Sequence, residues 1–137
     1  AAGLSDRIVL HADTVEDAAL EGTYDLVTAF ECMHDMPYPV SALRRMRELL
    51  SPGGAVLIAD EAVEDTLEGN TNFMGNLFYN ISVLHCLPQA MVFPDSAATG
   101  TVIKPSTLGG YAQEAGFTDI EVLPIENDQF RFYRLTP

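Results

Sequence analysis

The chain has 137 residues, enough for one domain with a single hydrophobic core. Its 20 acidic and 7 basic residues give a formal net charge of -13 at pH 7, which argues against nucleic-acid binding because that partner requires clustered Lys and Arg. No apolar run approaches the ~18 residues of a membrane span, and no signal peptide is recognisable. The two cysteines fit reduced thiols in an apolar core better than a disulfide framework. We therefore expect a cytoplasmic protein with neither nucleic-acid nor membrane partners.

The first twenty-odd residues are expected to contain one strand and one short helix. The apolar run of residues 7–12 (RIVLHA) predicts a strand. Thr14 and Asp17 form a capping-box-like pair, Thr-x-x-Asp, that predicts a helix over residues 14–20. We expect Gly22 to end this helix.

The next stretch predicts a core strand that ends in a site. Residues 24–30 (YDLVTAF) are typical of a parallel strand buried on both faces. Polar residues follow at once, with Glu31, His34 and Asp35 preceding a Pro-Tyr-Pro break. Ligands of open α/β sheets bind at the carboxyl ends of the strands, so this change of polarity marks a candidate site.

A helix and a second buried strand follow. The helix is predicted after Pro37 and Pro39 and runs to Leu50, with residues 51–54 (SPGG) ending it. Residues 55–60 (AVLIAD) predict the strand, and Glu61 comes directly after it. Strands that alternate with helices indicate right-handed crossovers and a parallel sheet.

The second half of the chain predicts two more helices and a hairpin. Apolar residues at near-helical spacing within residues 70–91 predict a long helix that ends near Pro88, and residues 92–105 are expected to form a loop. Ser106 is expected to cap the next helix, which Gly116 ends. The chain closes with two strands, residues 119–125 and 130–135, whose spacing suits an antiparallel hairpin.

Several of these motifs together resemble the class I S-adenosylmethionine-dependent methyltransferases. They are Asp13 after a strand, the YDLV strand of residues 24–27, its polar end FECMHD at residues 30–35, and the LSPGG junction at residues 50–54. The resemblance implies an α/β fold with a Rossmann-like methyltransferase sheet, mostly parallel and closed by the antiparallel hairpin.

The resemblance covers only the later part of the family's domain. The family's first two strands and its Gly-rich cofactor loop do not precede Ala1, so residues 1–137 would form a partial methyltransferase domain. Residues 82–88 (SVLHCLP) and 104–108 (KPSTL) resemble a bacterial subgroup that carries an additional winged-helix N-terminal domain.

The resemblance implies S-adenosylmethionine as cofactor and assigns residues to it. Asp13 would accept a hydrogen bond from the adenine amino group, with Thr14 beside it. Ala29, Phe30 and Glu31 would lie along the methionine portion. Without a ligand, Asp13 is a turn or capping residue and Phe30 belongs to the core.

The resemblance also implies catalytic and substrate-binding residues. His34 would serve as a general base for a hydroxyl acceptor, although the same position can shape the pocket wall or be structural. Glu31 would contact substrate or remain a solvated acid. Phe78 and His85, together with His34, would line the acceptor pocket, although a histidine on an apolar helix is more often a core residue. No metal site is expected, because the histidines are scattered in the sequence.

We therefore expect methyl transfer from S-adenosylmethionine to a small-molecule acceptor, at oxygen in preference to nitrogen or carbon. The first alternative is a non-catalytic methyltransferase-like fragment that acts as an interaction or dimerisation module, and a homodimer is among the expected partners. A second alternative is half of an enzyme completed by another chain. An α/β dehydrogenase ranks last, because its Gly-rich fingerprint is absent as well.

Overall fold

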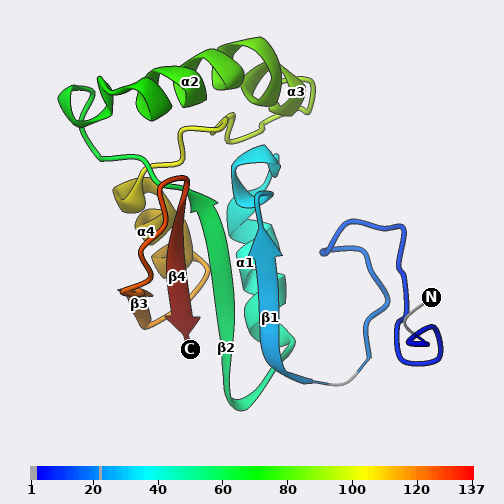
Figure 1. Ribbon diagram of the computed structural model, residues 1–137. Helices are drawn as coiled ribbons and strands as arrows, with labels where there is room; N and C mark the ends of the chain where they lie inside the picture. Colours follow the sequence, from blue (N-terminus) through cyan, green and yellow to red (C-terminus); the bar gives the residue numbers. More distant parts are fainter. Residues whose placement is uncertain (1–2, 22) are drawn as a thin grey trace.

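The computed structural model describes residues 3–21 and 23–137 and is built around one mixed sheet (Figure 1). The strands lie in the order β1-β2-β4-β3. β1 and β2 are parallel, whereas β2 with β4 and β3 with β4 are antiparallel. The strand bounds are Tyr24–Phe30 for β1, Leu50–Glu61 for β2, Asp119–Val122 for β3 and Phe130–Thr136 for β4.

Two helices cover one face of the sheet. Helix α1 (Pro39–Glu48) connects the parallel strands and begins with a proline, which suits the first turn of a helix because that turn needs no intrahelical N–H donor. Helix α4 (Pro105–Glu114) packs beside α1. Side chains from both helices and from the sheet form one buried cluster, which includes Leu43, Met46, Val56, Ile58, Leu108, Ala112, Tyr133 and Leu135.

The other face of the sheet is uncovered in the part of the chain that the structure describes. Side chains alternate along a strand, so Ala29 of β1 enters the core while Leu26 and Phe30 lie on the opposite face. Each of these two side chains is 55% exposed. β1 is also one of the two edge strands, with β3 at the opposite edge. The prediction that residues 24–30 are buried on both faces is therefore wrong: β1 is buried on one face only, and the other face of the sheet is open.

The expected strand over residues 7–12 is wrong. These residues are extended without strand pairing, and Leu10 is 90% exposed. A strand is stable only when a neighbour satisfies its backbone groups, and no described strand lies beside this segment. The fold class is confirmed, but the sheet has one parallel pair and two antiparallel ones instead of being mostly parallel, because this strand does not form.

The short helix predicted over residues 14–20 is also wrong. Its capping contact does form, with the Thr14 hydroxyl donating to Asp17 Oδ2 at 2.9 Å and the Asp17 N–H donating to Thr14 Oγ1 at 3.3 Å. Only a turn follows, since a nascent helix needs packing to offset the cost of nucleation and Ala18 is the one residue of this range that is buried. Gly22, the predicted helix stop, lies outside the described residues.

The long helix predicted within residues 70–91 is confirmed with an added irregularity, and it continues past its predicted end at Pro88 to Ala90. It consists of α2 (Phe73–Ile81), the π-helical segment η3 (Ser82–Cys86) and α3 (Leu87–Ala90). In Figure 1 it forms a separate layer beyond the carboxyl ends of β1 and β2. Its buried side carries small or aromatic residues, namely Gly75, Phe78, Ser82, Cys86 and Ala90.

Two predicted helix ends differ from the structure. Residues 51–54 do not follow α1 as a loop but belong to β2, which begins at Leu50. Ser106 is not the cap of α4 but lies inside its first turn, because Pro105 already occupies the first helical position. The Ser106 N–H donates instead to Asp65 Oδ1 at 2.9 Å. Gly116 follows the helix in the left-handed conformation, as predicted for a helix stop.

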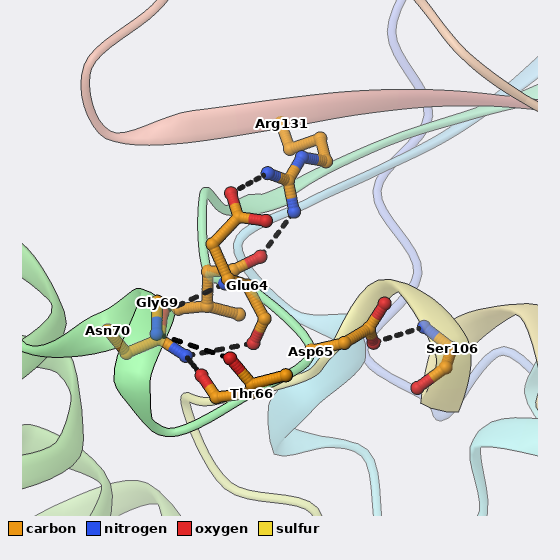
Figure 2. Close-up of polar contacts among 8 residues, drawn as sticks. Glu64, Asp65, Thr66, Gly69, Asn70, Ser106 and Arg131 are labelled. Carbon is orange, nitrogen blue, oxygen red and sulfur yellow. Dashed lines mark hydrogen bonds and ion pairs between the residues drawn. The ribbon is translucent and has the colours of Figure 1, made fainter.

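The segment between β2 and α2 is held by side chains that bond to backbone groups (Figure 2). Asn70 Nδ2 donates to the carbonyl oxygens of Glu64 and Thr66 at 2.8 and 2.7 Å, and its Oδ1 accepts from the Glu64 N–H at 2.8 Å. Arg131 of β4 pairs with Glu64 Oε1 at 2.6 Å. These contacts fix where α2 begins relative to the sheet.

Replacing Asn70 with Ala should lower the free energy of unfolding by about 2–4 kcal/mol, because three hydrogen bonds at a buried residue are lost and their backbone partners are left unpaired. Urea denaturation measures this change. Asn80→Ala is the matched control, since Asn80 is exposed and donates only to Asn76 within α2. Equal losses in the two variants would contradict the role assigned to Asn70.

Candidate functional site

The two parallel strands end side by side and bring three ionisable groups together. Phe30 of β1 is in register with Ala59 of β2, so the residues that follow Phe30 lie next to Asp60 and Glu61. The short 3-10 helix η1 (Met33–Asp35) then places His34 against these two acids.

His34 is buried, with 4% of its surface exposed, and contacts carboxylates on both sides of its ring. Its Nδ1 lies 2.6 Å from Asp60 Oδ1 and 3.1 Å from Glu61 Oε2. Its Nε2 lies 3.5 Å from Asp35 Oδ1. Asp60 and Glu61 are buried as well. We call His34, Asp60 and Glu61 the histidine cluster.

The cluster holds a proton strongly. Burial lowers the pKa of His34, but the hydrogen bonds and charges of Asp60 and Glu61 outweigh it and raise that pKa to about 11. Burial raises the pKa of Glu61 to about 7, although the hydrogen bond with His34 opposes this shift. At neutral pH His34 is therefore an imidazolium, and the cluster exchanges its next proton through Glu61.

A pocket of about 350 Å³ lies beside the cluster. It is lined by Asp13 and Thr14 of the N-terminal segment and by Cys32 and Asp35, which follow β1. Burial, followed by the charge of Asp60, raises the pKa of the Cys32 thiol, so this thiol is uncharged at neutral pH. Asp35 both lines the pocket and contacts His34, which connects pocket and cluster.

The other predicted cofactor residues lie elsewhere. Phe30 and Glu31 line a second hollow of about 300 Å³, which they share with aromatic residues of β4. Glu31 has a φ of 50°, a left-handed conformation that is rare outside glycine and common at functional sites. Ala29 is buried in the core. The structure thus brings Asp13 and Thr14 together but separates them from Phe30 and Glu31.

The predicted substrate residues are also divided. Phe78 is buried on the inner side of α2, whereas His85 is exposed on η3. The side chain of Cys86, next to His85, lies within 4.8 Å of the polar atoms of His34 and Asp35. The helix layer therefore contacts the site through Cys86.

Sequence reasoning missed Asp60 and Glu61 as site residues. Their signal was present, because both acids stand at the carboxyl end of a buried strand predicted to be parallel to the one that precedes His34. Two adjacent acids at such a position are expected to need a cationic partner.

None of the helices in the described ranges is both long and apolar enough to span a membrane.

Comparison with known proteins identifies the family. Residues 4–122 match the methyltransferase domain family. The ubiquinone biosynthesis O-methyltransferase of Nitrosospira multiformis is 37% identical over 123 residues, which cover 86% of this chain and 46% of that protein. The corresponding protein of Colwellia psychrerythraea is 30% identical over 111 residues, covering 79% of this chain and 41% of that protein. The chain thus spans less than half the length of these relatives.

Solved structures share the fold. PigF, solved with SAH, has a TM-score of 0.68 at 17% identity, covering 98% of this chain and 37% of that one. The S-adenosylmethionine-dependent methyltransferase SibL has a TM-score of 0.68 at 20% identity, covering 98% and 37%. The parallel strands with a site at their carboxyl ends define a Rossmann-like methyltransferase fold. The chain belongs to the class I S-adenosylmethionine-dependent methyltransferases.

The first pocket suits part of the cofactor of this family. Its volume falls in the range of small-molecule sites, and the Asp13 carboxylate is an acceptor for an exocyclic amino group. The residues present therefore fit the adenosine end.

Proposed function

We propose that the protein transfers a methyl group from S-adenosylmethionine to the hydroxyl group of a small molecule. Asp13 and Thr14 would hold the adenine end of the cofactor, which when bound supplies an electrophilic methyl group on its sulfonium. Methylation of a hydroxyl releases a proton and so requires a base. The observation that carries this proposal is the buried histidine cluster, which touches the pocket through Asp35.

The histidine cluster acts as the base in this proposal. His34 already carries a proton on both ring nitrogens at neutral pH, so neither nitrogen can accept another, and the base must be a carboxylate of the cluster. Glu61 lies 3.1 Å from Nδ1 and has a pKa of about 7. Deprotonated Glu61 takes up the proton that the hydroxyl group releases, while His34 remains an imidazolium that offsets the negative charge of the cluster. A base that titrates near the working pH is the most effective.

The pH dependence of turnover tests this mechanism. With a panel of small phenols as acceptors, turnover should rise with pH through about 7 as Glu61 loses its proton. Glu61→Gln should lower turnover by about 100-fold or more and remove this rise, while the affinity for S-adenosylhomocysteine stays within about twofold.

Glu126→Gln, in the exposed turn before β4, is the matched control and should leave the profile unchanged. Equal losses of turnover and cofactor affinity in Glu61→Gln would instead make the cluster structural. The alternative function, a non-catalytic interaction module, predicts no methyl transfer at any pH.

A further inference from the structure

The helix layer contains the longest uncharged stretch of the chain. Residues 70–94 include no Asp, Glu, Lys or Arg, so all 20 acidic and 7 basic residues lie outside it. Because the net charge is -13, most of the remaining surface repels other acidic surfaces. The helix layer is the part of this surface where such repulsion is weakest.

The outer side of this layer is apolar and exposed. Along α2, exposed apolar side chains recur every four residues at Phe73, Leu77 and Ile81. The surface continues through Leu84 of η3 to Met91, and Phe73 and Leu84 are 79% and 80% exposed. No other described segment covers this side, which we call the outer helix face. Soluble monomers rarely expose so many large apolar side chains together.

We propose that the outer helix face binds the same face of a second copy of this chain, across a two-fold axis. Such an interface places the uncharged faces of the two copies against each other, so no carboxylates are juxtaposed. Depletion of charge and exposed large apolar residues characterise the cores of homodimer interfaces. The three helical segments span 18 residues, about 27 Å, which allows two helices to pack side by side along their length.

Dimerisation through this face bears on the candidate site. The inner side of the same layer reaches the site through Cys86, which lies within 4.8 Å of the polar atoms of His34 and Asp35. The second copy would therefore hold the layer against the site. The interface stands on observations independent of the proposed methyl transfer and can hold even if that function fails.

Sedimentation of the 137-residue chain tests the proposal. The unaltered chain should form dimers, and more strongly at high salt, because salt screens the repulsion between two acidic copies. Leu84→Glu should raise the dissociation constant at least ~10-fold. Leu67→Glu is the matched control, since Leu67 is an exposed leucine outside the outer helix face, and it should dimerise like the unaltered chain. Circular dichroism checks that each variant is folded.

Three outcomes would overturn the proposal. One is a chain that stays monomeric at high salt, and another is a Leu84→Glu variant that dimerises normally. The third is loss of the dimer in Leu26→Glu but not in Leu84→Glu, which would place the interface on the open face of the sheet, where Leu26 is exposed. A monomer that binds neutral phosphatidylcholine vesicles would assign the outer helix face to a lipid surface instead.

Discussion

Replacing His34 with Leu should lower the free energy of unfolding at pH 7 by about 3–5 kcal/mol, because it leaves Asp60 and Glu61 buried without their cationic partner. Leucine keeps an apolar side chain of moderate size in place, so the change mainly removes charge and hydrogen bonding. Urea denaturation of both proteins gives the difference.

The pH dependence of this loss identifies its cause. The pKa of His34 is raised from 6.5 to about 11, so its contribution to stability is present in full below pH 6.5 and is lost as pH rises through 11. The pKa of Glu61 is raised from 4.5 to about 7, so the folded chain holds a proton that the unfolded chain releases, and stability again falls as pH rises through 7. The unaltered chain should therefore lose stability steadily between about pH 4.5 and 11.

In His34→Leu, the loss of stability above pH 7 that comes from deprotonation of the imidazolium should be absent. The difference between the two proteins should be larger at pH 5 than at pH 9, because the stability that the His34 imidazolium contributes is complete below pH 6.5 and declines as pH rises toward 11. His85→Leu, at an exposed histidine, is the control and should change stability by no more than about 0.5 kcal/mol. A His34→Leu variant within about 1 kcal/mol of the unaltered chain at pH 7 would mean that the histidine cluster does not stabilise the fold.

Replacing Gly75 with Ala should destabilise the chain by about 3 kcal/mol. A Cβ at this position would overlap the carbonyl oxygen of Asn70 and lie 2.6 Å from its carbonyl carbon and 2.8 Å from its Cα. These are backbone atoms, and the hydrogen bonds of the Asn70 side chain hold them in place. The start of α2 would have to move away from the segment that follows β2.

Gly110→Ala is the matched control for this change. Gly110 lies within α4, and a Cβ there would meet no atom within 4 Å beyond the nearby backbone of its own helix. Alanine is the better helix former, so this variant should gain about 0.5–1 kcal/mol. The midpoint temperature of thermal unfolding should therefore fall in Gly75→Ala and rise in Gly110→Ala. Equal shifts of this temperature would contradict the close approach of α2 to Asn70.

The elements that the sequence predicted correctly are those whose local pattern of apolar residues already shows which side chains the core will bury. The helical spacing of apolar residues in α1 and the apolar run of β2 indicate a helix face and a strand that the core then covers. β1 also forms as a strand, but it is buried on one face only, because no described segment covers the other face. Residues 7–12 have the same apolar character, yet they form no strand. Strand formation depends on a neighbour that no local pattern reveals.

The candidate site was predicted in part. The position of His34 after a core strand was enough to mark it, because strand ends collect ligand-binding residues. Its contact with Asp60 and Glu61 depends on the register between β1 and β2, which the sequence alone does not specify. The pocket could not be predicted either, since Asp13 and Cys32 line it together only because of the path that the irregular segment before β1 takes.

Calorimetric titration of this chain with S-adenosylhomocysteine tests the central claim, that the Asp13 pocket holds the cofactor of this methyltransferase. The account predicts saturable binding that Asp13→Ala weakens by about 1–3 kcal/mol through loss of one hydrogen bond. Asp6→Ala, at an exposed acid outside the pocket, should leave the affinity unchanged. Absence of saturable binding, or equal affinities in all three proteins, would contradict it.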